Sequence, residues 1–128
     1  MAETEKITIN MSAVDLGKID LLVQEGLYAN RTDFIRTSIR NQIDRHNMEI
    51  QQAVTRHSYG IGVFRYNRKD LEMLKAKGEK LRLSVVGMLI LADDISPALA
   101  GEGIESIQVL GILSASDAVK AVLAERIK

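Results

Sequence analysis

Three side chains with hydrogen-bonding groups recur at every second position near the amino terminus: Lys6, Thr8 and Asn10. They supply a cation, a hydroxyl and an amide, which are groups able to meet base edges in a DNA groove. The positions that alternate with them are apolar: Ile7, Ile9 and Met11. Strict alternation is typical of a half-buried β-strand, so we predict a strand over residues 5–11 whose polar side chains are exposed.

A helix is predicted directly after this strand. Ser12 can cap it, and Asp15 places a negative charge in its first turn. Its apolar residues recur at three- and four-residue spacing: Leu16, Ile19, Leu22 and Val23. This spacing predicts one buried stripe, and Gly26 supplies a natural stop.

A second helix is predicted from a turn and cap at Asn30–Arg31–Thr32. The residues that recur at helical spacing are Phe34, Ile35, Ser38, Ile39 and Ile43. The pattern continues more weakly toward Ile50. One strand followed by two helices cannot stand alone, because the strand has two unpaired edges. Pairing with a second copy across a two-fold axis satisfies both edges, so we predict a homodimer with an antiparallel ribbon lying on four helices.

Residues 7–11 (ITINM) and 26–36 (GLYANRTDFIR) carry a family resemblance. They resemble the ribbon-helix-helix family, the CopG/Arc/MetJ type of transcriptional regulator, over residues 4 to about 48 and not beyond. The resemblance implies that the paired ribbon enters the major groove of double-stranded DNA. It further implies that Lys6, Thr8 and Asn10 read bases, while Arg31, Thr32 and the amides after them contact phosphate.

General physics is compatible with these implied roles. A two-stranded ribbon fits a major groove about 12 Å wide. The amides at a helix start bind phosphate with the help of the helix dipole. Lys6 can donate to guanine and Asn10 can pair with adenine. The alternative interpretation of Lys6, Thr8 and Asn10 is a strand face that is exposed to solvent and binds nothing.

For Arg36 and Arg40 we favour solvent exposure or intersubunit ion pairs over phosphate contacts.

The pattern changes after His57, where three strand–helix units follow one another. The strand centres fall near Val63, Val86 and Val109, 23 residues apart (86 − 63 and 109 − 86). Gly60 and Gly62 are assigned to a turn or bulge before the first strand. The helices are expected from a cap at Asn67, over 93–100 with a cap at Asp94 or Ser96, and from Ser116 through Ile127. We predict a small parallel, solenoid-like sheet.

The fold class is therefore α+β, with a DNA-binding and dimerisation domain at 1–57 and a β/α repeat module at 58–128. The chain has 128 residues and equal numbers of basic and acidic side chains, 17 of each. This neutrality argues against an extended electrostatic nucleic-acid binder and leaves room for a focused site.

The sequence has no cysteine, no export signal and no apolar run long enough to span a bilayer. We therefore expect a protein of the prokaryotic cytoplasm and nucleoid, with no membrane partner.

The function expected from these patterns is a sequence-specific transcriptional regulator, in particular a repressor. The C-terminal module is expected to assemble dimers into higher homo-oligomers or to receive a protein partner or effector. Two alternatives remain: a DNA-binding antitoxin of a toxin pair, and a scaffold protein that does not bind DNA. We expect no enzyme, cofactor or metal site, because no nucleophile–base pair, metal-ligand set or nucleotide loop stands out.

Overall fold

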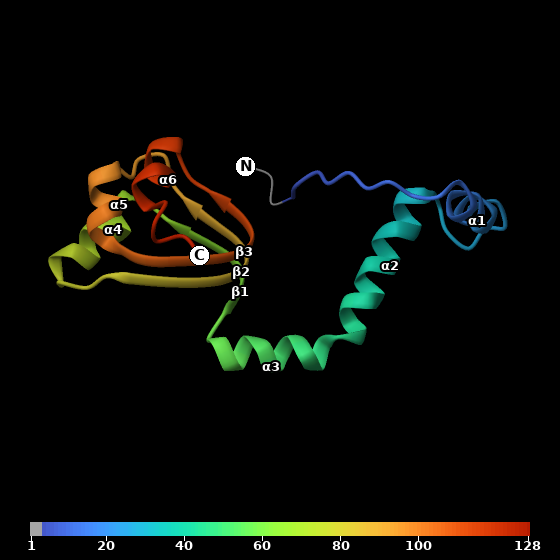
Figure 1. The fold of residues 1–128 in the computed structure, drawn as a ribbon, viewed down its shortest axis with the longest axis horizontal. Coiled ribbons are helices and arrows are strands. Elements are labelled where there is room, and N and C mark those ends of the chain that lie inside the picture. The colour runs from blue at the N-terminus through green and yellow to red at the C-terminus, as the bar shows by residue number, and fades with distance from the viewer. Residues whose placement is uncertain (1–3) are drawn as a thin grey trace. The chain divides into compact units, whose positions relative to one another are not determined.

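The computed structural model describes residues 4–128, which form two compact units: Lys6–Ala53, and Val54–Lys128 together with residues 4 and 5. The elements are drawn in Figure 1. Their bounds are α1 Ala13–Gln24, α2 Arg31–Arg45, α3 Asn47–His57, β1 Gly60–Tyr66, α4 Arg68–Ala76, β2 Leu81–Leu91, α5 Pro97–Gly103, β3 Ile104–Ser114 and α6 Asp117–Leu123. The α+β class predicted from the sequence is confirmed.

The first helix, α1, begins and ends as predicted. The Ser12 hydroxyl accepts a hydrogen bond from the Asp15 amide at 3.1 Å and caps the helix. The chain leaves the helix at Gly26, whose φ of 84° lies in the left-handed region that favours glycine. Ile19 is the buried residue of the apolar stripe.

The second helix is shorter than predicted. α2 ends at Arg45, and α3 begins at Asn47 after a turn at His46. The His46 amide donates to the Ile43 carbonyl at 3.0 Å, which closes a tighter turn than an α-helical bond would. No glycine or proline marks this break, so the prediction of one helix continuing toward Ile50 is wrong.

The segment predicted as a strand, residues 5–11, has no regular secondary structure in the single chain. A β-strand is defined by hydrogen bonds to a neighbouring strand, and no described segment of the chain supplies one to these residues. The segment joins α1 through Ser12, whose backbone is extended (φ −66°, ψ 149°). A strand at residues 5–11 therefore requires a partner from outside the chain.

The unit Val54–Lys128 contains the predicted parallel sheet, with strand order β1-β2-β3. Each strand is followed by a helix, so the three strand–helix repeats are confirmed. The predicted strand centres are confirmed, because the bounds of β1, β2 and β3 are centred on Val63, Val86 and Val109, 23 residues apart. The pairing register has a slightly larger offset than the spacing of these centres. Gly60 pairs with Val85, an offset of 25 (85 − 60), and Arg82 pairs with Ser106, an offset of 24 (106 − 82), after an irregularity at Leu81/Arg82.

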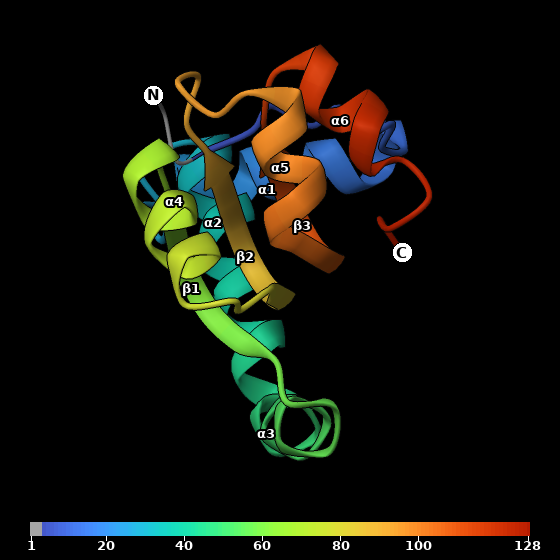
Figure 2. The ribbon, with the colours of Figure 1, turned by 90° about the vertical axis from the view of Figure 1, so that its left-hand side faces the viewer.

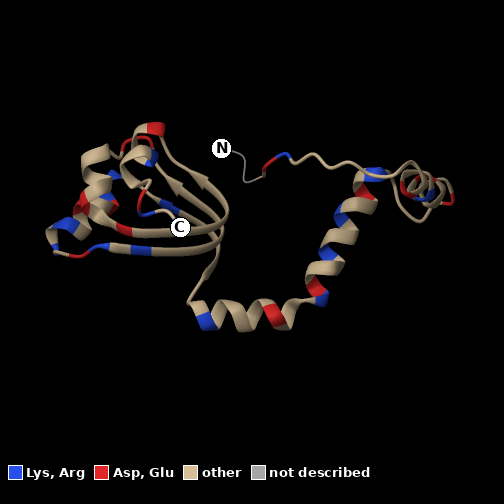
Figure 3. Ribbon diagram, viewed as in Figure 1, with Lys and Arg blue, Asp and Glu red and all other residues tan. Residues whose placement is uncertain are grey.

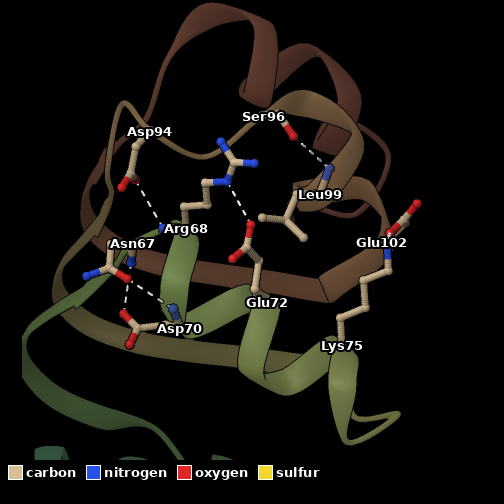
Figure 4. Close-up of polar contacts among 9 residues, drawn as sticks. All are labelled: Asn67, Arg68, Asp70, Glu72, Lys75, Asp94, Ser96, Leu99 and Glu102. Carbon is tan, nitrogen blue, oxygen red and sulfur yellow. Dashed lines mark hydrogen bonds and ion pairs between the residues drawn. The ribbon is translucent and has the colours of Figure 1, made fainter.

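Local capping sets the starts of the three helices in this unit. Asn67 and Asp70 form a reciprocal capping box at α4, drawn in Figure 4. Ser96 caps α5 through the Leu99 amide at 3.2 Å, which decides between the two caps left open by the sequence. Asp94 instead accepts from the Arg68 amide at 3.0 Å, and so links the β2–α5 connection to the start of α4.

The glycines before the first predicted strand lie inside β1, so their assignment to a turn is wrong. The register places Gly62 beside Gly87 and Gly87 beside Gly111. All three have a strongly positive φ, from 125° to 139°. A Cβ atom on Gly87 would overlap the Gly62 carbonyl, and one on Gly111 would overlap the Gly87 carbonyl. The three strands approach closely along this glycine row, and only glycine fits there.

The last helix is also shorter than predicted, because α6 ends at Leu123 rather than near Ile127. The residues after it return to the sheet. Ile107 donates from its amide to the Arg126 carbonyl at 3.0 Å and accepts from the Lys128 amide at 2.8 Å. The amino-terminal part of β3 is therefore paired on both sides.

The core of this unit lies between one face of the sheet and the helices α4, α5 and α6 (Figure 2). The central strand β2 contributes alternate residues: Leu83, Val85, Leu89 and Leu91. The helices pack against them with Leu71, Leu99, Val119 and Leu123. Burying a side chain of this size stabilises the fold by about 1.5–3 kcal/mol, so this layer holds the unit together.

Candidate nucleic-acid interface

The three polar side chains of the amino-terminal segment are exposed: Lys6, Thr8 and Asn10. None of them has a hydrogen-bond or ion-pair partner among residues 4–128. Their donors and acceptors are therefore available to a ligand outside the chain. They lie at alternate positions, which is the spacing that puts side chains on one face of an extended segment.

The apolar side chains that alternate with them are also exposed. Ile7 is 75% exposed and Ile9 is 63% exposed. The same unit exposes further large apolar residues on its helices and the connection between them: Val14, Leu21, Leu27, Ile39 and Ile43. No residue of α2 is buried. A single copy of this unit thus lacks a closed apolar core, and it exposes the surface that a partner would have to cover.

An apolar groove lies beside this segment within the same unit. It has a volume of about 280 Å³. It is lined by Met11, Asp15, Lys18, Ile19, Leu22 and Phe34. At the end of the connection between α1 and α2, the Tyr28 ring meets Phe34 edge to face, with the ring centroids 4.9 Å apart. This aromatic contact fixes the turn that leads into α2.

The amino end of α2 is held by two reciprocal hydrogen bonds. The Asn30 side chain accepts from the Asp33 amide at 2.7 Å, and the Asp33 carboxylate accepts from the Ala29 amide at 2.9 Å. Thr32 is exposed, and its hydroxyl has no partner among the described residues. This helix end therefore offers a hydroxyl and the positive end of the helix dipole to an anion, with the Asp33 charge opposing it.

Arg31 makes a contact that the sequence motifs do not predict. Its Nε and Nη2 atoms donate to the two carboxylate oxygens of Asp20, each at 2.8 Å. This hydrogen-bonded pair lowers the pKa of the Asp20 carboxyl and raises the pKa of the Arg31 guanidinium. Both side chains remain about half exposed, 55% and 50%. No local pattern in the sequence signals this pair, because its two residues lie eleven positions apart on different helices.

Charge in this unit is concentrated on α2, where Figure 3 shows more blue than red. The helix has four arginines (Arg31, Arg36, Arg40 and Arg45) and two acidic residues (Asp33 and Asp44), a net charge of +2 (4 − 2). Arg36 and Arg40 are exposed and form no ion pair with the described residues. The helix is thus a local cationic element in a chain without net charge.

The residues predicted to contact bases and the residues predicted to contact phosphate lie on different segments. Lys6, Thr8 and Asn10 share one segment, while Arg31 and Thr32 lie at the start of α2. No hydrogen bond or ion pair joins the two sets within residues 4–128. In the same part of the chain, no three His, Asp or Glu side chains are placed to hold a metal ion, and no helix is long and apolar enough to cross a membrane.

Comparison with known proteins bears on both units. No curated protein and no solved structure matches the chain. A sequence model described as the Ribbon-Helix-Helix transcriptional regulator family matches residues 2–120. This match confirms the resemblance and extends it, since the motifs alone place its end at about residue 48. The strand–helix repeats are therefore part of the matched region.

Proposed function

Because the chain belongs to the ribbon-helix-helix transcriptional regulator family, we propose that it is a sequence-specific DNA-binding repressor that acts as a homodimer in the cytoplasm. The observation that carries this proposal is the pair of exposed faces on residues 5–11. One face is polar and unpartnered, and the other is apolar, with Ile7 75% and Ile9 63% exposed. Exposing isoleucines to water is costly, so a partner for the apolar face is expected.

In the proposed dimer, residues 5–11 of two copies pair as an antiparallel ribbon. Each copy then supplies the hydrogen-bonding neighbour that the other lacks. Ile7, Ile9 and Met11 face inward and lie on the four helices of the two copies. The groove of about 280 Å³ beside α1, together with the exposed residues of α2, gives these side chains an apolar surface to cover. The same pairing leaves Lys6, Thr8 and Asn10 on the outer face.

The outer face of the ribbon is proposed to read bases in the major groove. Lys6 donates to guanine O6 or N7, Asn10 pairs with adenine through its amide, and Thr8 contacts a base or a thymine methyl. Each such contact contributes about 1–3 kcal/mol of discrimination between bases. Only a few contacts of this kind are needed, which is compatible with a chain of zero net charge.

The start of α2 is proposed to contact backbone phosphate through Thr32, Arg31 and the adjoining amides. Asp20 engages two of the N–H donors of the Arg31 guanidinium, and a guanidinium has five. Three donors (5 − 2) therefore remain for a phosphate. Asp20 holds the guanidinium in a fixed position, which lowers the entropy cost of that contact.

A scaffold function is the second candidate, favoured by the absence of net charge. Selection of bound sequences from a random DNA pool separates the two functions. A repressor of this type should enrich a motif with two-fold symmetric half-sites, whereas a scaffold should enrich none. Replacing Lys6, Thr8 and Asn10 together by alanine should abolish binding to the enriched motif while the dimer stays folded.

A matched control for that variant is available elsewhere in the chain. Lys69, Thr55 and Asn47 are the same three residue types and are also exposed. Their joint replacement by alanine should leave binding to the motif unchanged. If the control variant lost binding to the same extent, the assignment of base contacts to the ribbon would be wrong.

A further inference from the structure

The parallel sheet in the unit Val54–Lys128 has an open edge on each side. The strand order is β1-β2-β3, so β1 has no strand on its outer side among the described residues. On the outer side of β3, residues 126–128 lie beside Ile107 only. The edge of β3 over residues 109–113 has no strand beside it in the described part of the chain. The backbone N–H and C=O groups along such edges are a template for a further strand.

The two open edges belong to repeats of the same kind. In the register, Gly60 pairs with Val85 and Val85 pairs with Val109. The same step, applied once more, places Gly60 of a second copy beside Val109, and β1 of that copy then follows the open part of β3. The chain turns at Ser58, where φ is 55°, before it enters β1. The edge that this strand would occupy is therefore separate from the one that residues 126–128 occupy.

The glycine row supplies a second, independent observation. A Cβ atom on Gly87 would overlap the Gly62 carbonyl, and one on Gly111 would overlap the Gly87 carbonyl. In both cases the Cβ would point toward the preceding strand. Gly62 has the same conformation, with a φ of 139°, yet a Cβ there would meet only the Phe64 ring, at 3.9 Å. A strand on the outer side of β1, with a carbonyl beside Gly62, would account for this conformation.

The helices follow the same order as the strands, and their row is also open at α4. Helix α4 packs against α5, and α5 packs against α6. The other flank of α4 carries Asp70, Met73 and Lys77, which line a groove of about 320 Å³ beside the end of β1. A second groove, of about 300 Å³, lies along β1 at Gly60 and Phe64, on the side that faces the helices. A helix that follows a strand beside β1 would lie over these grooves.

The flanks of α4 and α6 that would then meet carry opposite charges. Val122 of α6 faces α5. Lys120 lies two residues earlier, so it projects from the opposite flank, and it is exposed. Asp70 lies on the outer flank of α4. Lys75 and Glu102 already join α4 to α5 by an ion pair of 2.7 Å, so a contact of this kind has a precedent between neighbouring helices of the fold.

We propose that β3 and α6 of one copy stack on β1 and α4 of a second copy, head to tail, so that both layers continue from chain to chain. The second copy is the occupant because its first repeat fits the register step, the glycine conformation and the helix order that join the repeats within one chain. The contact is heterologous, so each added copy leaves one edge open and a row can grow. The contact itself does not depend on DNA binding.

The size of the contact makes it reversible rather than permanent. The seven residues of β1 extend for about 23 Å, and the sheet and helix layers together are about 20 Å deep, which gives roughly 460 Å² on each partner. Stable interfaces bury roughly 800 Å² on each partner. A contact of this size suits copies that are held side by side, for example along DNA, because their effective concentration is high. A trapping reaction is therefore the appropriate test.

Cysteine cross-linking tests the register, because the chain contains no cysteine of its own. The row Ile61–Val86–Leu110 places Leu110 of one copy beside Ile61 of the next. A short bifunctional thiol reagent spans the roughly 4.8 Å between neighbouring strands. Without DNA, full-length Ile61→Cys mixed with full-length Leu110→Cys should form covalent dimers at least about tenfold faster than Ile61→Cys mixed with Lys69→Cys, an exposed control on α4. A mixture no faster than the control would overturn the proposal.

The composition of the products tests the head-to-tail arrangement. Each dimer should contain one Ile61→Cys chain and one Leu110→Cys chain, which mass spectrometry identifies when one variant is isotope-labelled. Neither variant alone should cross-link at the rate of the mixture. Equally fast cross-linking of Ile61→Cys alone would mean that two β1 edges meet each other, and it would overturn the proposal. Because DNA is absent, failure of the proposed DNA binding would leave these results unchanged.

A substitution in the glycine row tests whether this edge makes the contact. Gly62→Ala in the Ile61→Cys background should slow cross-linking to Leu110→Cys by about tenfold or more, because the Cβ would meet a carbonyl of the second copy. Gly78→Ala is the matched control, since Gly78 also has a positive φ, 70°, and a Cβ there meets no atom within 4 Å. Equal slowing by both changes would overturn the proposal. Urea unfolding shows whether each variant is folded, and the cysteine mixture tests the contact without either substitution.

Discussion

Asp20 and Arg31 join the two helices of the amino-terminal unit through a pair of parallel hydrogen bonds, each 2.8 Å long. This arrangement matches the planar fork of the guanidinium to both carboxylate oxygens. It fixes the start of α2 against α1 by an exposed contact rather than by buried area. The pair connects the stability of this unit to the phosphate contact proposed for Arg31.

The first prediction concerns pH. The paired state lowers the pKa of Asp20 below the ordinary carboxyl value of 3.8, so the pair stabilises the folded unit above that value. This contribution should be lost as the pH falls below 3.8 through the lowered pKa of the folded state. Asp20→Asn should therefore slightly lower the unfolding temperature at pH 7, and the difference from the wild type should vanish in strong acid. Thermal melts followed by circular dichroism would check this.

Glu25→Gln is a suitable control for that experiment. Glu25 is an exposed acidic residue at the end of the same helix, and no ion pair involves it among the described residues. The control should show no pH-dependent difference of this kind. The same acid-sensitive difference in both variants would mean that the Asp20–Arg31 pair is not its source.

The second prediction concerns salt dependence. Arg31→Ala should weaken binding to all DNA sequences by a similar factor, because an interaction with phosphate carries no sequence information. The slope of log K against log[salt] should fall in magnitude by roughly 0.9 for each phosphate that the variant no longer neutralises. Fluorescence anisotropy at several salt concentrations would measure both quantities. A change confined to one DNA sequence would contradict the phosphate role.

The third prediction concerns the ribbon dimer. Thr8 is the central residue of 5–11, so in a symmetric antiparallel ribbon it lies opposite Thr8 of the second copy. Cα atoms in such pairs are about 4.5–5.5 Å apart, which suits a disulfide. The Thr8→Cys variant should form a disulfide-linked dimer on mild oxidation, whereas the exposed control Thr55→Cys should remain largely reduced. Denaturing gels without reductant would show the outcome.

The fourth prediction concerns the inner face of the ribbon. Ile9→Asp should dissociate the dimer, because a carboxylate would be buried between the ribbon and the helices. Its effect on a single chain should be small, since Ile9 is 63% exposed there. Sedimentation analysis should show a lower mass than for the wild type. Lys6→Asp, on the outer face, should leave the mass unchanged and impair DNA binding only.

The fifth prediction concerns the glycine row. Gly87→Ala should destabilise the unit Val54–Lys128 far more than Gly62→Ala, because only the first substitution drives a Cβ into a neighbouring carbonyl. Gly62→Ala still imposes a positive φ on alanine, which costs about 1–3 kcal/mol. Urea unfolding of the two full-length variants would give the comparison. Equal destabilisation would mean that backbone strain alone, and not the overlap, sets the cost.

Local signals in the sequence are sufficient to predict where the helices begin. The sequence predicts caps at Ser12, Asn30, Asn67 and Ser116, and each accepts the expected amide hydrogen bond. These contacts span three residues, so the neighbouring sequence determines them. The parallel repeat is also predictable, because runs of apolar residues separated by helical patterns favour that topology.

Features that depend on distant residues are not predictable in this way. The turn at His46 lacks a glycine or proline signal, and the register of the sheet depends on close approach of the strands at Gly62, Gly87 and Gly111. The Asp20–Arg31 pair joins residues eleven positions apart through the packing of two helices. Strand formation at residues 5–11 also depends on more than the local sequence. A strand requires a neighbouring strand, and the described part of one chain supplies none to these residues.

The glycine row has a consequence for tolerance to mutation. Exposed positions usually accept almost any amino acid, yet Gly111 is exposed and should accept none without loss of folding. A saturation mutagenesis screen of the full chain should therefore find intolerant glycines about 24 residues apart, a spacing that reflects the repeat length of the fold. The positions of the intolerant glycines would then indicate which residues of neighbouring strands lie side by side.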